Sequence, residues 1–505
     1  MLTTIRAEKP LYSIFLFFVV SLTGHLIAYK IVHIPVQLEA VILFTAFSFY
    51  PLIRKPSLGI YLIFIIVPFI PFIRRLYYLQ YSRPEIDPLI AVSDIIISLT
   101  MTGLFFVFRE NREEQKCVRI INRIILVYFV YLIIRTFAVN ILPLREALMR
   151  FRFYGPSVLL FFIGSLFATH YTLLKRVWLL TLFIGCIAAL YGLKQLYFGY
   201  STAEQLWFSS ISFTTLFIKG LARPFSLFQS PASFADYMQF AIIGVLILSG
   251  QKKTLKRKMI LLLIPLFFYT ALITSVRSNW IGILLSLFIW FFILQIKSNK
   301  KRITLIVSIS LIFIFIQLLD FTINYDKGIN SVISVITGAF DQKQLNLLVT
   351  ERTSAISNPF EEYSLLSRLS LWKYLITLSA YPPHALLGRG VGSLNADSLY
   401  FTYLAEFGYP GLFFILWFVI FSIKKGFTLI DSSVPTEIIS LAKGITLLNI
   451  VLAVVNITGT HIHSFPGDVY FWFWNGVLFK LCAVHKDVQK NDQTETDDSH
   501  SISTG

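Results

Sequence analysis

Apolar runs long enough to cross a membrane dominate this chain. A transmembrane helix needs about 20 consecutive apolar residues. The sequence predicts fourteen such segments: 11–30, 36–53, 58–73, 89–108, 120–140, 155–173, 177–198, 232–250, 259–275, 279–296, 303–321, 396–423, 438–458 and 468–484. Because 56% of the 505 residues are hydrophobic and only 14% are charged, a soluble domain could not hide its apolar surface. We therefore expect an all-α polytopic integral membrane protein.

Two of these segments have features of their own. The third contains Pro68 and Pro71, and we expect it to be broken or re-entrant. The first is longer than the core of a signal peptide, and no small-x-small cleavage site follows it. We therefore expect it to be a retained transmembrane helix.

Short basic loops give the expected orientation. If all fourteen segments cross the membrane, six short basic loops lie on the same side as the N-terminus: 54–55, 109–123, 175–176, 252–258, 297–302 and 424–425. Positively charged loops stay in the cytoplasm, so we expect both termini there. The same loops account for the net charge of +17, and nucleic acid is not an expected partner. The acidic, Ser/Thr-rich tail after Lys486 is expected to be disordered.

The basic residues of the loops predicted on the other side are mostly arginine. The longest, 322–395, is the one long polar run within the apolar sequence, and it holds amphipathic helical patterns over 329–340 and 365–376. Arginine forks onto phosphate and carboxylate groups. We therefore expect this face to bind an anionic ligand near the membrane; the alternative is that some of these arginines only contact lipid headgroups.

A series of short elements follows in this part of the chain. They are Arg223 with Pro231, Arg277 with Trp280 and Gly282, Arg368 with Trp372, Gly388-Arg389-Gly390-Val391-Gly392, and Glu406 with Gly408 and Gly411. In order and placement these elements resemble the O-antigen ligase and Wzy-type polysaccharide polymerase superfamily over about residues 220–425. The resemblance implies a GT-C-like membrane fold with N-terminal helices in 1–220, a family core in 221–425, C-terminal helices in 426–485 and a tail in 486–505.

The resemblance also implies an activity. Members of this superfamily are glycosyltransferases that join glycans outside the membrane. The donor is an oligosaccharide on a polyprenyl (undecaprenyl) diphosphate, and the acceptor is a hydroxyl of a second glycan. Arginines such as Arg277 and Arg223 would stabilise the charge of the leaving diphosphate without a metal. We see no external Asp-x-Asp motif or His/Asp cluster, and the three cysteines form no CxxC pair. No metal and no cofactor are expected.

The base that accepts the proton is left open by the sequence. Many ligases carry a histidine-asparagine pair where this chain has Ala396-Asp397-Ser398. Asp397 would be a carboxylate base or a sugar contact, or it would only cap the following helix. His384, His461 and His463 are each a candidate base, a sugar contact or a headgroup-level side chain.

Five further residues are candidate substrate contacts. Arg368 and Trp372 would act from the long loop, and Arg389 is either a phosphate contact or a residue at the lip of the site. Arg135 is an intramembrane arginine, which is a functional candidate by default, or it snorkels to the headgroups. Glu406 would pair with one of the arginines.

Several functions compete at this stage. The first is a polymerase of capsule, exopolysaccharide or teichuronic-type wall polysaccharide, working with a flippase and a chain-length regulator in the membrane lipid. The nearest alternative is an O-antigen ligase acting on a lipid core. A lipid-linked glycan flippase or transporter fits less well, because the unusual charges lie on one side. A SEDS-type peptidoglycan polymerase fits the arginine elements less well still.

Overall fold

The structure is a computed structural model that describes residues 36–80, 88–108, 116–137, 144–210, 216–218, 221–250, 259–294, 363–392, 396–463 and 465–502. These residues are almost entirely helical. The exception is a two-residue antiparallel ladder between β1 (Phe217–Ile218) and β2 (Leu221–Ala222). In the described ranges, seven helices are long and apolar enough to cross a membrane. The predicted all-α membrane character is confirmed. The apolar segments 11–30 and 303–321, and the amphipathic pattern over 329–340, lie outside the described residues.

The chain divides into two compact units, which we describe separately. The first combines residues 1–112 with 201–211. Its elements are α2 (Val36–Arg54), α3 (Pro56–Ile66), η1 (Val67–Phe69), α4 (Ile70–Gln80), η2 (Pro88–Ile90), α5 (Ala91–Phe108) and α10 (Thr202–Ser210). The break predicted in the third apolar segment is the 3-10 turn η1 around Pro68, because proline cannot donate the helical hydrogen bond.

The second unit combines residues 113–200 with 212–505. Its helices are α6 (Lys116–Phe137), α7 (Leu144–Arg152), α8 (Gly155–Phe167), α9 (Tyr171–Phe198), α11 (Pro231–Ser249), α13 (Leu263–Ile273), α14 (Arg277–Phe288), η4 (Ile289–Ile293), α18 (Tyr363–Leu378), α19 (Pro382–Leu387), α20 (Leu399–Ile430), α21 (Thr436–Val455) and α22 (Gly467–Ile502). This division differs from the predicted boundary at residue 220.

Close packing of α8 on α22 explains the difference. A Cβ atom added to Gly164 would lie 2.0 Å from the carbonyl oxygen of Phe473, and one added to Gly476 would lie 2.0 Å from that of Phe161. Glycines let two membrane helices approach this closely. Helices predicted to belong to an N-terminal domain therefore pack with the C-terminal end of the chain.

The last helix also corrects a prediction. The tail after Lys486 was expected to be disordered, but α22 continues to Ile502. Residues 486–502 contain neither glycine nor proline, so nothing in the chain interrupts a helix that has already formed.

Helix α11 lies at the centre of the second unit. Ser230 caps it by accepting the amide of Ser233 at 3.2 Å, and Pro231 occupies its first turn. It packs against α9, α13, α14 and α21, and every residue of α11 except Ala232 is buried. A polar side chain on α11 therefore faces protein and not lipid, which is the property that positions the site described below.

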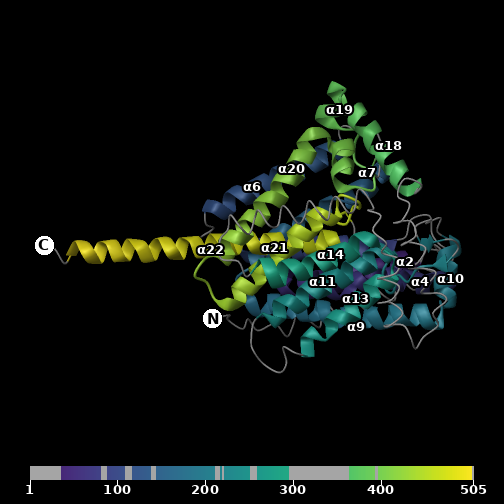
Figure 1. Ribbon diagram of the computed structural model, residues 1–505, viewed down its shortest axis with the longest axis horizontal. Coiled ribbons are helices and arrows are strands. Elements are labelled where there is room, and N and C mark those ends of the chain that lie inside the picture. The colour runs from purple at the N-terminus through teal and green to yellow at the C-terminus, as the bar shows by residue number, and fades with distance from the viewer. Residues whose placement is uncertain are drawn as a thin grey trace. The chain divides into compact units, whose positions relative to one another are not determined.

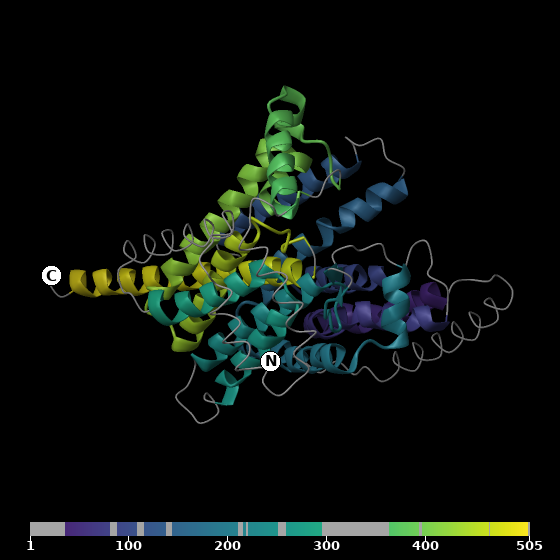
Figure 2. The same ribbon diagram turned by 45° about the vertical axis from the view of Figure 1, so that its right-hand side comes forward.

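Helix α20 is broken inside its apolar stretch. Gly408 has φ 68° and ψ −166°, and Pro410 follows it. Three carbonyl groups before the break find donors elsewhere in the second unit: Ala405 accepts the amide of Arg389 at 2.7 Å, Glu406 accepts that of Gly390 at 3.1 Å, and Phe407 accepts the hydroxyl of Tyr131 at 3.0 Å. Figures 1 and 2 show α18 and α19 standing beside this part of α20. The glycine-rich segment after α19 therefore serves as a partner for a broken membrane helix.

Two glycines make this contact possible. A Cβ atom on Gly388 would lie 2.4 Å from the carbonyl carbon of Glu406, and one on Gly408 would lie 2.4 Å from the carbonyl oxygen of Ala385. Gly388, Gly390 and Gly392 all have positive φ, which confirms that these glycines set backbone geometry.

Replacement of Gly388 by alanine tests this docking, and Gly199 provides a matched control. Both have almost the same backbone conformation (φ 63°, ψ −168° and φ 76°, ψ −172°), but nothing lies within 4 Å of a Cβ on Gly199. Gly199→Ala should cost only the backbone strain of about 1–3 kcal/mol. Gly388→Ala should lose at least about 2 kcal/mol more, seen as a larger drop in the melting temperature of the detergent-solubilised protein. Equal losses would contradict the docking.

Candidate active site

A polar face on the buried helix α11 begins the site. Asp236 and Gln239 are 2% and 1% exposed and lie three residues apart, on one side of the helix. An ionisable side chain inside an apolar helix is costly unless it is paired, and it is a functional candidate by default. The partners of Asp236 come from two distant parts of the chain.

The first partner segment is the turn between α13 and α14. Ser275 in this turn has φ 56°, and α14 begins directly afterwards with Arg277, Ser278 and Asn279. The Asn279 amide donates to Asp236 Oδ1 at 2.6 Å and is 3.2 Å from Gln239 Oε1. Arg277 and Ser278 are half-buried, whereas Asn279 is fully buried. The predicted short turn with Arg277 is confirmed, and Asn279 ties it to α11.

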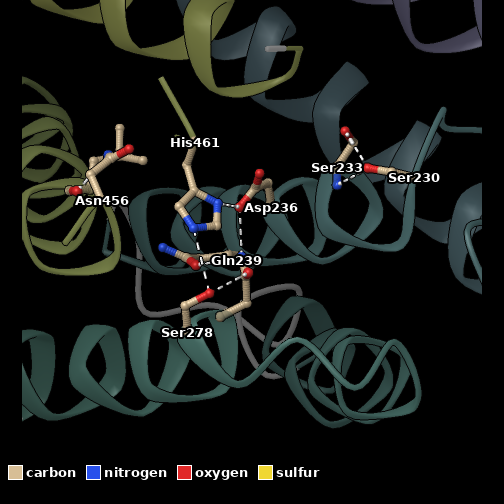
Figure 3. Close-up of polar contacts among 9 residues, drawn as sticks. Ser230, Ser233, Asp236, Gln239, Ser278, Asn456 and His461 are labelled. Carbon is tan, nitrogen blue, oxygen red and sulfur yellow. Dashed lines mark hydrogen bonds and ion pairs between the residues drawn. The ribbon is translucent and has the colours of Figure 1, made fainter. Parts of the chain in front are cut away.

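The second partner segment is the loop between α21 and α22, which carries His461. Its Nδ1 atom lies 2.7 Å from Asp236 Oδ1, and its Nε2 atom lies 3.5 Å from the hydroxyl oxygen of Ser278. Figure 3 shows the imidazole between these two groups. Because the aspartate accepts the Nδ1 proton, the Nε2 lone pair faces Ser278. This arrangement is suited to removing a proton from a hydroxyl group.

The loop that carries His461 is fixed at both ends. The carbonyl oxygen of His461 would lie 1.6 Å from a Cβ atom on Gly467, so the loop packs directly on the start of α22. The amide of Leu399, the first residue of α20, donates to the carbonyl groups of Asn456 and Gly459 at 2.9 and 2.8 Å. The imidazole therefore projects from a segment held by two helices.

Arg223 stabilises the turn before Arg277. It follows strand β2, is 7% exposed, and its Nη1 atom is 3.3 Å and 3.4 Å from the carbonyl oxygens of Thr274 and Ser275. These are the carbonyls that precede α14, so Arg223 helps to set where Arg277 and Ser278 project. The structure thus brings together Arg223, Arg277 and His461, three of the residues proposed from the sequence.

A second polar cluster surrounds the break in α20. Arg135 is 1% exposed, and its Nη2 atom is 3.3 Å from the backbone oxygen of Glu406. The carboxylate of Glu406, 3% exposed, accepts the hydroxyl of Tyr154. The Tyr154 ring lies 4.5 Å from that of His463. Arg135 therefore points into the protein, so the alternative that it snorkels to the headgroups is not supported.

The remaining candidates have no described contact with His461, and two of them make contacts that hold helices together. Trp372 donates its indole N–H to the carbonyl of Ala396 at 2.9 Å and stacks on Phe401 at 4.7 Å, which holds α18 against α20. Arg389 contributes its backbone to the glycine segment, and its side chain is exposed. His384 is half-buried in α19. Arg368 lies in α18, but its side chain is outside the described residues.

Asp397 does not cap α20, which corrects one alternative. The N-cap residue is Ser398, and Asp397 precedes it with φ 48° and an exposed side chain. An aspartate tolerates this left-handed conformation better than most residues. Asp397 therefore lies next to the segment that contacts the His461 loop.

Sequence reasoning missed Asp236, Gln239, Ser278 and Asn279. One signal was available: Asp236 is an acidic residue inside the predicted span 232–250, where charge is rare. In the described part of the chain, no group of three or more His, Cys, Asp and Glu residues is arranged to hold a metal ion.

Comparisons with known proteins add no family to this description. No protein-family model matches the chain, and no curated protein matches it. The resemblance drawn from the motifs therefore stays a hypothesis.

The neutral state of His463 can be tested through stability. Burial lowers the pKa of His463 to about 3, whereas an unfolded histidine titrates near pH 6.5. As the pH falls from 7 to 5, the unfolded state takes up a proton that the folded state refuses, so folding becomes less stable. His463→Gln removes this contribution, and its melting temperature should fall less over that range than that of the original protein. An equal fall in both proteins would contradict a buried, neutral His463.

Proposed function

We propose that this protein is a membrane glycosyltransferase that uses a polyprenyl-diphosphate-linked glycan as donor. It extends or transfers glycan repeat units on the outer face of the bacterial plasma membrane, for a capsule, exopolysaccharide or teichuronic-type wall polysaccharide. The proposal includes about fourteen transmembrane helices in a GT-C-like fold with cytoplasmic termini. O-antigen ligation to a lipid core is the nearest alternative reaction.

One observation carries the proposal. A base and a cation are found at the same turn: the hydroxyl of Ser278 lies 3.5 Å from His461 Nε2, and Arg277 is the residue directly before Ser278 at the start of α14. A glycosyl transfer from a diphosphate needs these two elements together, a base for the acceptor hydroxyl and positive charge for the leaving group.

The electrostatics of α14 support an anionic ligand. The amide of Asn279 donates to the carbonyl of Val276 at 3.1 Å, and the helix dipole adds partial positive charge at this end of α14. An arginine at this end costs stability, roughly 0.3–1 kcal/mol in exposed helices. The first residue of α14 is nevertheless Arg277. The helix dipole and the guanidinium together favour a phosphate group at this point.

The proposed reaction assigns His461 as the base in place of Asp397. His461 Nε2 takes the proton of the acceptor hydroxyl while that oxygen attacks the anomeric carbon of the donor. The bond from this carbon to the diphosphate breaks, and its electron pair leaves with the diphosphate near Arg277. Asp236, 2.7 Å from Nδ1, orients the ring and stabilises the imidazolium that forms.

The cation is tested by Arg277→Ala, with Arg176→Ala as the control. Arg176 is an exposed arginine near the start of α9 and lies in a loop predicted to be cytoplasmic. The assay is elongation of a defined lipid-diphosphate-linked repeat unit by the protein reconstituted in liposomes, with and without a chelator. Arg277→Ala should lower the rate roughly 10²–10³-fold, the cost of losing one charge-stabilising donor. Unchanged elongation, or movement of the substrate across the bilayer without elongation, would overturn the proposal.

The base is tested by His461→Gln, with His170→Gln as the control because His170 is exposed at the start of α9. Loss of a general base costs roughly 10²–10⁴-fold, so His461→Gln should lose that much elongation rate and His170→Gln none. If His461→Gln elongates normally, the base lies elsewhere.

A further inference from the structure

The serine beside His461 is itself placed to react. Asp236, His461 and Ser278 form a continuous series: 2.7 Å from carboxylate to Nδ1, and 3.5 Å from Nε2 to the serine hydroxyl oxygen. A base within reach of a hydroxyl, oriented by a third group, is the arrangement that activates a serine nucleophile. The distance from His461 Nε2 to the Ser278 hydroxyl oxygen is longer than a normal hydrogen bond, as is common before a substrate is bound.

Three hydroxyl groups within helices of the second unit show the common alternative. Ser286, Thr181 and Thr446 donate to the carbonyl four residues earlier in their own helices, at 2.7, 3.0 and 2.7 Å. This is the usual arrangement for a hydroxyl in a membrane helix. Ser278 contacts instead His461 Nε2 and, at 3.4 Å, Asn279 Oδ1. The carbonyl four residues before it, that of Thr274, accepts from Arg223.

Two buried groups beside this series lack hydrogen-bond partners among the described residues. They are the donor Gln239 Nε2 and the acceptor Asn456 Oδ1. Gln239 and Val455, the residue before Asn456, both lie 2.8 Å from the position of a Cβ on Gly282. An unpartnered donor on α11, three residues after Asp236, and an unpartnered acceptor at the end of α21, where the His461 loop begins, suit a ligand that carries hydroxyl or ester oxygens.

We propose that Ser278 is a nucleophile activated by His461 and Asp236, and that this site transfers acyl groups from carboxylic esters. The inference shares His461 with the proposed function but does not depend on glycosyl transfer. Esters are available to a membrane site from two sources, acyl lipids and O-acylated glycans, and the chain length of the acyl group distinguishes them.

The step balances as an acyl transfer. The hydroxyl proton of Ser278 passes to His461 Nε2 as the serine oxygen bonds to the carbonyl carbon. The tetrahedral oxyanion forms at the start of α14, where the helix dipole and the positive charge of Arg277, the residue before Ser278, favour an anion. Its collapse breaks the bond from carbon to the alcohol oxygen, and the alcohol leaves with the proton from Nε2. A second hydroxyl or water then takes the acyl group by the same steps.

A fluorophosphonate probe tests the nucleophile without knowledge of the substrate. The purified, detergent-solubilised protein is treated with a tagged alkyl fluorophosphonate and, separately, with the smaller diisopropyl fluorophosphate. The serine oxygen bonds to phosphorus, fluoride leaves, and peptide mass spectrometry locates the adduct. We expect modification at Ser278, with the rate at least 100-fold lower in His461→Gln and at least 10-fold lower in Asp236→Asn.

Ser233→Ala is the matched control, because Ser233 is a serine of α11 whose hydroxyl contacts Ser230 at 3.1 Å. It should be modified at Ser278 as fast as the original protein, and Ser278→Ala should not be modified there. Release of nitrophenol from p-nitrophenyl acetate and p-nitrophenyl decanoate then shows whether short or long acyl groups are accepted. No adduct at Ser278 in protein with a normal melting temperature would overturn the inference, as would an adduct that forms equally fast in His461→Gln.

The two proposals fail separately. If Ser278 stays unmodified while Arg277→Ala abolishes elongation, only the acyl transfer is wrong. If Ser278 is modified with the expected dependence on His461 while Arg277→Ala elongates normally, acyl transfer stands and the glycosyltransferase is wrong.

Discussion

Hydrogen-bonding groups inside a membrane must find partners within the protein, and this requirement shapes the second unit. The break in α20 at Gly408 leaves carbonyl groups without helical donors, and the glycine segment, Tyr131 and Arg135 supply them. The carboxylate of Asp236 presents the same problem on α11, and Asn279 and His461 solve it from two other elements. In each case a segment distant in sequence supplies the hydrogen bond that a buried polar group requires. The same hydrogen bonds therefore hold the residues of the site together.

The same requirement separates the two polar clusters by chemistry. At the α20 break, the hydrogen-bond acceptors are mostly backbone carbonyls, whose positions the helix fixes, and His463 is kept neutral by its burial. Around Asp236, the partners are side chains with groups left over: the Nε2 atom of His461 and the amide nitrogen of Gln239. The first cluster is therefore suited to holding a bent helix, and the second to handling a proton.

The sequence predicted what depends on neighbouring residues. Apolar runs located α11, α20 and α21, and positive-φ conformations at Gly388, Gly390 and Gly392 follow from a glycine-rich segment after a helix. The pairing of Asp236 with His461 could not be predicted, because 225 residues separate them and neither periodicity nor spacing relates the two segments. Trp372 shows the same limit: the motif made it a candidate substrate contact, and only the structure shows that its indole N–H donates to the carbonyl of Ala396. A polar or aromatic residue reveals its role only when its partner is known.

A single imidazole facing the protein's own hydroxyl has a consequence for any substrate. Nε2 has one lone pair in the ring plane, so an incoming acceptor hydroxyl and Ser278 cannot both use it at once. Ser278 has a second acceptor, Asn279 Oδ1 at 3.4 Å, and rotation about one bond moves its proton from one to the other. Asn279 also holds Asp236, so the residue that would receive the displaced serine is the one that keeps the base aligned. Under the two proposed reactions, a hydroxyl bound at His461 would turn Ser278 away from Nε2, and an ester without a hydroxyl would leave Ser278 as the group that is deprotonated. The chemistry at His461 is then decided by which oxygen the ligand places within reach of its lone pair.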